Sequence, residues 1–380
     1  MIRLEGVTKS YGASEAVRGI SLSIVEGELV VLIGPSGCGK TTTLKMINRL
    51  IEPTSGTITV GGKDTATLDP QRLRRKIGYV IQSIGLFPHM SVQQNIQVVP
   101  DLLGWSKKRS AARADELLQL VGLEPERYRH AFPKELSGGQ AQRVGVARAL
   151  AVDPPVLLMD EPFGAVDPIT RERLQDEFLG LQGKLKKTIV MVTHDIDEAI
   201  KMADKICVLN EGRIEQTDSP ETLLASPKNR FVRQFVGADR ALKRLSRIPI
   251  LKHMNAVESV ALSDGAEAAR AKLRAHKSVY VVDGEGRYLG WLNRSAFAAE
   301  PDIAGAYTAV DAGSGALLAS VNAREALSRM LAHGVGELPV VDDALRLKGA
   351  LKLSTLVALT ADSADTDGEN AGKAEMSAPP

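Results

Sequence analysis

The sequence predicts an α/β fold with a mostly parallel sheet and a helical insert, followed by a smaller α+β region. Three apolar runs, at 29–33, 156–159 and 189–193, are typical of strands buried on both faces of a parallel sheet. A helical pattern from about residue 91 to 151 precedes the second run. Near the C-terminus, a strand–turn–strand pattern recurs after a displacement of 59 residues, and an Ala-rich helix precedes each copy.

The segment 34–41, Gly-Pro-Ser-Gly-Cys-Gly-Lys-Thr, joins the first apolar strand to a helix. Such a loop directs backbone N–H groups and the positive end of the helix at one point, which suits a phosphate chain. We expect Lys40 to reach the β- and γ-phosphates and the Thr41 hydroxyl to hold Mg²⁺. The alternative, a Gly-rich turn, does not require Lys-Thr at its end. The candidate nucleotide-binding residues here are Gly34, Pro35, Ser36, Gly37, Cys38, Gly39, Lys40, Thr41 and Thr42.

Composition narrows the class of protein. A chain of 380 residues can bury a large core and is expected to form two domains. The net charge of +2 gives no indication of a nucleic-acid partner, and we expect none. There is no apolar leader and no run of about 18 apolar residues, so neither secretion nor a membrane span is expected. Two cysteines, Cys38 and Cys207, argue against a disulfide framework and fit a reducing compartment.

The segment 136–140, Leu-Ser-Gly-Gly-Gln, allows two interpretations. Ser137 and Gln140 have the spacing of a capping box at a helix start. Because Gly138 and Gly139 carry no bulky side chains, the same helix start is also suited to an anion, such as a phosphate brought by another molecule.

Polar residues follow two of the apolar strands, at the sheet edge where open α/β sheets bind ligands. We expect Asp160 to bind Mg²⁺, directly or through water, and Glu161 to polarise the water that attacks the γ-phosphate. His194 is expected to hydrogen-bond to the γ-phosphate or to that water. The alternatives are an acidic turn and a structural histidine.

Together, these motifs resemble the ATP-binding subunit of ABC transporters over roughly the first 240 residues. The resemblance implies ATP and Mg²⁺ as cofactors, with Tyr11 stacked on adenine and 34–41 as the Walker A loop. It implies that Gln82 senses Mg²⁺ and the transmembrane partner. It also makes Glu161, His194 and Gln82 the catalytic residues, and Thr41, Gln82 and Asp160 the metal-binding residues.

The resemblance extends to the segments that would meet a second subunit. It makes 136–140 the signature motif and Asp167 the carboxylate at a dimer seam, although 164–167 reads Gly-Ala-Val-Asp instead of the more usual Ser-Ala-Leu-Asp. In this family two subunits pair head to tail, so that Ser137 and Gly139 of one close over the γ-phosphate held by Lys40 of the other. ATP hydrolysis is then expected to require a homodimer.

Segments 46–50, 81–89 and 193–199 resemble those of quaternary-amine and osmoprotectant importers. This implies uptake of glycine betaine, choline, carnitine or proline betaine through two transmembrane permease subunits, fed by a periplasmic or extracellular solute-binding protein. The chain is then expected at the cytoplasmic face of the plasma (inner) membrane, as a peripheral subunit. The alternatives are a polar amino-acid or methionine importer, and a soluble ABC-type ATPase that acts on nucleic acid or ribosomes.

The C-terminal repeat resembles a pair of CBS modules. Its copies centre on 280–292 and 339–351, and the Asp expected to hold a ribose is replaced by Ala296 and Thr355. We expect either a regulatory module that responds to osmolarity or ionic strength, or one that only stabilises a dimer. The predicted organisation is an ATP-binding domain at 1–239 with a helical subdomain at about 88–152, a basic connector at 240–253, CBS-like domains at 254–360 and a disordered acidic tail at 361–380.

Overall fold

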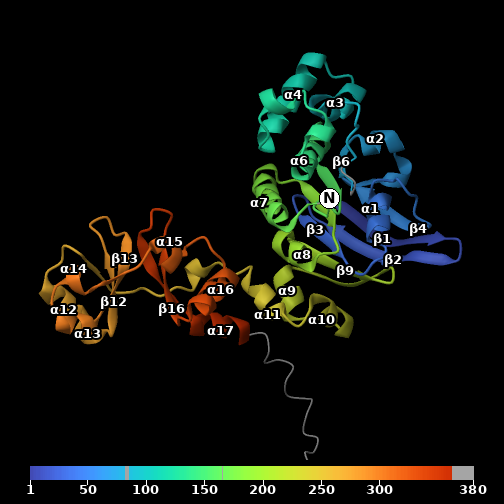
Figure 1. Cartoon of the computed structure of the whole chain (residues 1–380). Coiled ribbons are helices and arrows are strands. Elements are labelled where there is room, and N and C mark those ends of the chain that lie inside the picture. The colour runs from blue at the N-terminus through green and yellow to red at the C-terminus, as the bar shows by residue number, and fades with distance from the viewer. Residues whose placement is uncertain (82–84, 165, 362–380) are drawn as a thin grey trace, which may run out of the picture. The chain divides into compact units, whose positions relative to one another are not determined.

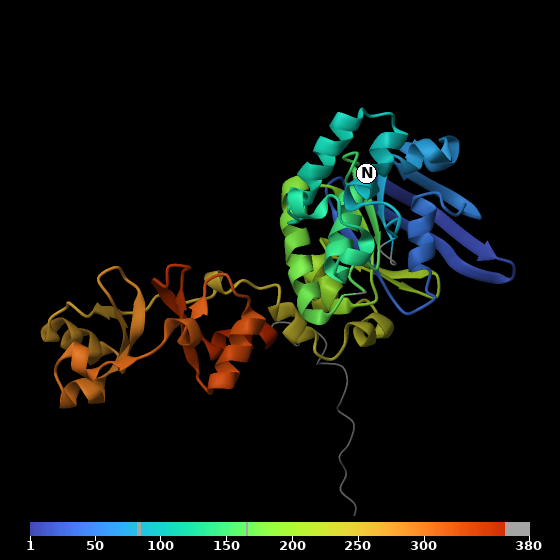
Figure 2. The same ribbon diagram turned by 45° about the horizontal axis from the view of Figure 1, so that its top comes forward.

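The computed structural model describes residues 1–81, 85–164 and 166–361, in two compact units that divide after Gly237 (Figures 1 and 2). Gln82 and all but the first residue of the predicted acidic tail lie outside the described residues. Within the described ranges, no helix combines the length and apolar character needed to cross a membrane.

A six-stranded sheet forms the centre of the first unit, with the order β10-β9-β3-β8-β7-β6. Every neighbouring pair is parallel except β9 and β10. The strands are β3 (Leu29–Ile33), β6 (Ile77–Val80), β7 (Val156–Asp160), β8 (Thr188–Val192), β9 (Lys205–Asn210) and β10 (Arg213–Asp218). Strands β3, β7 and β8 are buried at every position, because both faces of the sheet are covered.

Two hydrophobic cores lie on the two faces of this sheet, and alternate residues of one strand enter different cores. In β3, Leu29 and Val31 pack with the helices, while Val30 and Leu32 pack toward a second sheet. That second sheet is antiparallel, in the order β2-β1-β4-β5. Its strands are β1 (Ile2–Tyr11), β2 (Ser14–Ile24), β4 (Ser55–Val60) and β5 (Lys63–Asp64).

Among the described residues between β6 and β7, the helices α3 to α6 make up the helical insert. Helices α3, α4 and α6 contact one another and form a separate layer in Figure 1. The helices of the first unit are α1 (Lys40–Ile47), α2 (Pro70–Arg74), α3 (Val92–Leu102), α4 (Lys107–Leu120), α5 (Pro125–Tyr128), α6 (Gly138–Ala149), α7 (Pro168–Leu185), α8 (Ile196–Met202), α9 (Pro220–Ala225) and α10 (Arg230–Val236).

The second unit contains two small sheets, in the orders β11-β12-β13-β14 and β15-β16-β17. Their strands are β11 (Ser259–Ala261), β12 (Ser278–Val282), β13 (Tyr288–Asn293), β14 (Thr308–Ala309), β15 (Leu317–Leu318), β16 (Glu337–Val341) and β17 (Leu347–Lys352). The helices are α11 (Arg240–Leu245), α12 (Ala266–Ala275), α13 (Arg294–Ala299), α14 (Ile303–Ala306), α15 (Ala312–Gly315), α16 (Ala323–His333) and α17 (Leu353–Ala361).

The sequence repeat is present in this unit as a repeated strand pairing. Val281 pairs with Gly290 in the first copy, and Val340 pairs with Gly349 in the second, 59 residues later in both strands. The copies meet through two matching hydrogen bonds, from Tyr288 N–H to the Leu345 carbonyl (2.9 Å) and from Leu347 N–H to the Gly286 carbonyl (3.0 Å). The donors are equivalent residues of the repeat, and so are the acceptors, so the copies are related by an approximate two-fold axis.

The basic connector at 240–253 is partly buried. Helix α11 packs against α16 and α17. Lys243 is buried, and its ammonium group pairs with the Asp239 carboxylate at 3.0 Å.

Candidate functional site

The loop between β3 and α1 depends on glycines. Gly37 and Gly39 have φ values of +79° and +99°, a region that favours glycine. A Cβ added at Gly39 would lie 2.6 Å from the Ala16 carbonyl oxygen, and one added at Gly34 would lie 2.1 Å from that of Leu209. The close approach of neighbouring backbone therefore requires glycine at Gly34 and Gly39.

Lys40 is the first residue of α1, and its side chain is held by the loop itself. Its ammonium group donates to the carbonyl oxygens of Gly34 at 2.7 Å and Pro35 at 3.0 Å. The residue is only 8% exposed. A lysine folded back over a Gly-rich loop at a helix N-terminus places a positive charge where a phosphate chain can bind.

Thr41 and Asp160 bring two oxygen ligands together. The Thr41 hydroxyl donates to Asp160 Oδ1 at 3.0 Å. Burial raises the pKa of Asp160, and the hydrogen bond from Thr41 opposes that rise. A hydroxyl and a carboxylate beside a phosphate-binding loop fit Mg²⁺, which usually takes one or two protein ligands together with phosphate oxygens and water.

Glu161 and His194 meet at the ends of β7 and β8. Glu161 has a φ of +46°, and its N–H donates to the Val192 carbonyl at 2.9 Å. His194 Nδ1 lies 3.3 Å from Glu161 Oε1, and the histidine side chain is 65% exposed. The structure thus brings Lys40, Thr41, Asp160, Glu161 and His194 to the carboxyl edge of one parallel sheet.

The signature segment forms the start of α6. Ser137 Oγ accepts from the Gln140 N–H at 3.3 Å, and the Ser137 N–H donates to Gln140 Oε1 at 2.9 Å, so the capping box is present. A Cβ on Gly139 would lie 3.1 Å from Thr170 in α7. In the described part of the chain, no hydrogen bond or ion pair joins 137–140 to the loop 34–42.

Asp167 and Tyr11 lie at other exposed positions. Asp167 caps α7 by accepting from the Thr170 N–H at 3.0 Å, a bond that lowers the pKa of its carboxyl group. Tyr11 ends β1 with 49% of its surface exposed, and the Lys9 ammonium lies 5.2 Å from the centre of its ring.

Sequence reasoning missed a polar network behind the site. Arg171 donates to the Val166 carbonyl at 3.0 Å, and its guanidinium lies 3.7 Å from Asp195 Oδ2. Glu198 is buried in α8 and accepts from Gln175 at 3.2 Å, and burial raises its pKa. The one available signal was the placement of Arg171 four residues after Asp167, on the same helix face.

This chain is similar to a known protein family and to individual proteins. Residues 17–164 match the family model described as ABC transporter. The chain is 47% identical to the osmoprotectant import ATP-binding protein OsmV of Salmonella typhimurium, over 92% of this chain and 94% of that protein. It is also 47% identical to the glycine betaine/carnitine/choline transport ATP-binding protein OpuCA of Bacillus subtilis, over 97% and 99% of the two chains.

A solved structure is similar to the first unit. It is the dimeric, post-hydrolysis state of the ATP-binding cassette MJ0796 bound to ADP and Pi, which is 37% identical with a TM-score of 0.53. The match covers 58% of this chain and 98% of that chain.

Proposed function

This chain belongs to the ATP-binding subunits of ABC transporters that import osmoprotectants, and on that basis we propose how its own residues carry out the reaction. It is the ATP-hydrolysing subunit of an importer for quaternary amines such as glycine betaine, choline and carnitine, and it works with membrane permease subunits. One observation is the main support for the proposed site. The phosphate loop, the two carboxylates and the histidine meet at one edge of the parallel sheet.

We assign the hydrolytic roles from these contacts. Lys40 neutralises the β- and γ-phosphates. Thr41 and Asp160 would hold Mg²⁺, which would supply positive charge beside the phosphate oxygens. Glu161 orients the attacking water and accepts its proton. His194, 3.3 Å from that carboxylate, hydrogen-bonds to the water or to the γ-phosphate. Tyr11 is assigned to the adenine ring and Gln82 to sensing of Mg²⁺ and the permease.

We also propose a head-to-tail homodimer. Ser137 is exposed at the start of α6, whereas Gly139 is buried in its first turn. Neither residue forms a hydrogen bond or ion pair with the loop 34–42 in the described part of this chain, which supports a role of this helix start toward a second subunit's phosphate. Asp167 starts α7 next to that segment. The similar MJ0796 cassette was solved as a dimer.

The second unit is proposed to be a pair of CBS modules that regulates transport. The support is the repeated strand pairing within this unit. The alignment with OpuCA of Bacillus subtilis covers 97% of this chain and therefore includes this unit. We further propose that the chain works with two permease subunits and an external solute-binding protein. It is then a peripheral subunit at the cytoplasmic face of the membrane.

Uptake of labelled glycine betaine tests the proposal. Host cells that lack this chain would be restored with the wild type or with Lys40→Ala, and assayed at low and high osmolarity with choline, carnitine and an amino acid as competitors. We expect the wild type to restore uptake, the quaternary amines to compete and Lys40→Ala to fail at equal expression. Competition by the amino acid alone would contradict the solute class, while leaving ATP hydrolysis in place.

A further inference from the structure

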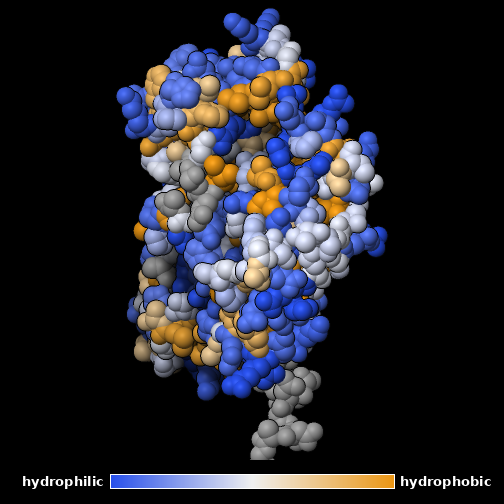
Figure 3. Space-filling view, turned by 90° about the vertical axis from the view of Figure 1, so that its right-hand side faces the viewer, coloured by the Kyte–Doolittle hydropathy of each residue, from blue (hydrophilic) through white to orange (hydrophobic). Residues whose placement is uncertain are grey.

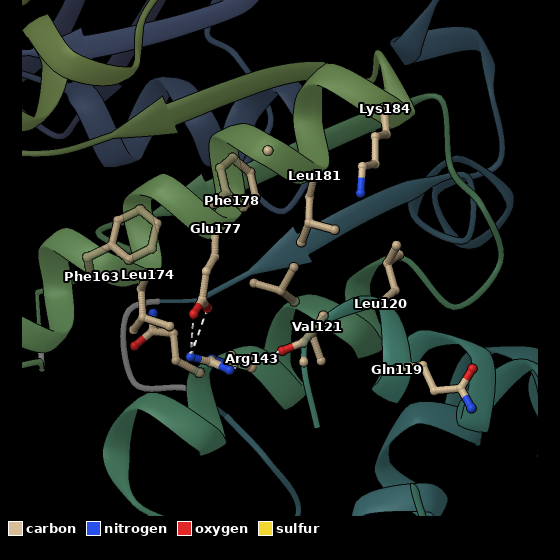
Figure 4. Close-up of a pocket in the computed structure, with 14 residues that line it drawn as sticks. Gln119, Leu120, Val121, Arg143, Phe163, Leu174, Glu177, Phe178, Leu181 and Lys184 are labelled. Carbon is tan, nitrogen blue, oxygen red and sulfur yellow. Dashed lines mark hydrogen bonds and ion pairs between the residues drawn. The ribbon is translucent and has the colours of Figure 1, made fainter. Parts of the chain in front are cut away.

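A cavity of 330 Å³ lies in the first unit, outside the nucleotide site (Figure 4). One wall comes from the helical insert, at the end of α4 and on α6, and the other comes from Phe163 and α7. Sites for small organic molecules have volumes of about 300–1000 Å³. The cavity therefore has the size of a small-molecule site, and its two walls belong to different layers of the fold.

The walls of this cavity are mainly apolar. Val121, Val146 and Leu174 are buried within them. Phe163 and Phe178 add two rings in a T-shaped, edge-to-face arrangement, with centroids 6.2 Å apart. An occupant with an apolar body would remove this surface from water, which is the main source of affinity in such sites.

Charged groups on α7 and α6 border the apolar walls. Glu177 points at Arg143, and their charged atoms are 2.8 Å apart, so this pair is internally neutralised (Figure 4). Lys184 lies on α7 two turns after Glu177, or roughly 10 Å further along the axis. It is exposed, and no described residue forms an ion pair with it. The unmet charge at the cavity is therefore positive.

Gln142 adds one polar group to the wall. The residue is 4% exposed, and its Oε1 has no hydrogen-bond partner among the described residues. An unmet buried acceptor costs free energy, which a donor can recover. This favours an occupant that carries a hydroxyl group as well as an anionic end.

We propose that this cavity binds an amphipathic carboxylate, with the apolar chain between the two walls and the carboxylate at Lys184. A medium-chain hydroxy fatty acid has this chemistry. Such an occupant would contact both the helical insert and α7.

Calorimetric titration of the full-length chain with 3-hydroxydecanoate, below its micelle concentration and without nucleotide, tests the site. We expect one molecule to bind per chain. Decyltrimethylammonium, which has the same chain length and the opposite charge, is expected to bind at least about ten-fold more weakly. Lys184→Glu should weaken binding of the acid about ten-fold, while Lys108→Glu, at an exposed lysine outside the cavity, should not. Leu181 on α7 also lines the cavity, so Leu181→Trp, which fills this space, should abolish binding.

Several results would overturn the proposal. Equal binding of the cationic and anionic probes would mean that Lys184 does not select the ligand. Unchanged binding by Lys184→Glu, or by a folded Leu181→Trp, would place the acid elsewhere. Since none of these titrations requires ATP hydrolysis, they are independent of the proposed transport function.

Discussion

At the scale of single residues, Asp160 and Glu161 are adjacent in the sequence, but their carboxylates lie in different environments. Asp160 is buried beside the Thr41 hydroxyl, whereas Glu161 turns away through a left-handed backbone conformation and meets His194. The proposed metal ligand and the proposed base need different surroundings. The strained turn at Glu161 provides both within one strand end.

Glu161→Gln tests the assignment of the base. The amide keeps the shape of the side chain but cannot accept the proton, so we expect ATP hydrolysis to fall at least about 100-fold. With ATP bound and not cleaved, the variant should elute as a dimer in size-exclusion chromatography with ATP and Mg²⁺. Glu26→Gln, at an exposed turn, is the control. Hydrolysis at the wild-type rate would show that another group is the base.

Glu198 gives a prediction for the pH dependence of stability. Burial raises its pKa above the ordinary value of 4.5, so between that value and the raised one the folded protein binds more protons than the unfolded chain. This contribution to stability is therefore present at acid pH and is lost as the pH rises through the raised pKa. Urea unfolding from about pH 4.5 to about pH 7 should show wild-type stability falling relative to Glu198→Gln. The stability of Glu172→Gln, at an exposed position on α7, should change with pH in parallel with that of the wild type. If the stability of Glu198→Gln had the same pH dependence as that of the wild type, the argument would be wrong.

The residues that the sequence could predict are those fixed by local geometry. The loop at 34–41 and the residues after β7 and β8 follow from strand ends that share one sheet edge, and Ser137 with Gln140 follows from helix capping. Arg171 and Glu198 could not be predicted in the same way. Asp195, the partner of Arg171, and Gln175, the partner of Glu198, come close to them only through tertiary packing.

At the scale of elements, α7 connects several parts of the site. Its start is capped by Asp167, its second turn carries Arg171, and its later turns line the apolar cavity. Arg171 contacts the segment before Asp167 and the segment after His194. It is thus placed to position the proposed dimer seam relative to the histidine.

Arg171→Met tests this positioning role. Loss of a hydrogen bond and an ion pair from one charged group should lower kcat on the order of ten-fold, while the KM for ATP stays near the wild-type value, because Arg171 does not contact the phosphate loop. Arg171→Lys should restore part of the rate. Arg173→Met, two residues along the same helix, is the control. A variant that lowers kcat and weakens ATP binding equally would point to general disruption of the fold.

Element boundaries also show where prediction from sequence ends. The apolar runs predicted the bounds of β3 and β8 closely, because strands buried on both faces have few polar positions. The basic connector was harder to interpret, since its charge pattern suggests solvent. Burial of Lys243 results from the packing of α11 against α16 and α17. Long-range contacts of that kind leave no local periodicity to detect.

At the scale of the whole molecule, the chain joins an ATP-hydrolysing unit to a repeat with its own cores. The clusters around Val340 and Val281 are separate, and a third cluster with Tyr288 and Val341 lies where the copies meet. Tyr280 also crosses between the copies, and its hydroxyl donates to Glu337 at 2.7 Å. A unit with its own cores can be removed without opening the nucleotide site.

Truncation after Gly237 therefore tests the regulatory role of the second unit. A cut at residue 250 would leave α11 without α16 and α17 and would expose Lys243 and its neighbours, so the boundary between the compact units is the better place. We expect the truncated chain to support glycine betaine uptake that no longer rises with osmolarity. Tyr280→Phe keeps the whole unit but removes the hydrogen bond to Glu337, and it should shift the osmotic threshold without abolishing uptake. If the truncated and intact chains gave the same ratio of uptake at high and low osmolarity, the osmotic response would arise elsewhere in the transporter. The second unit would then have only a stabilising role.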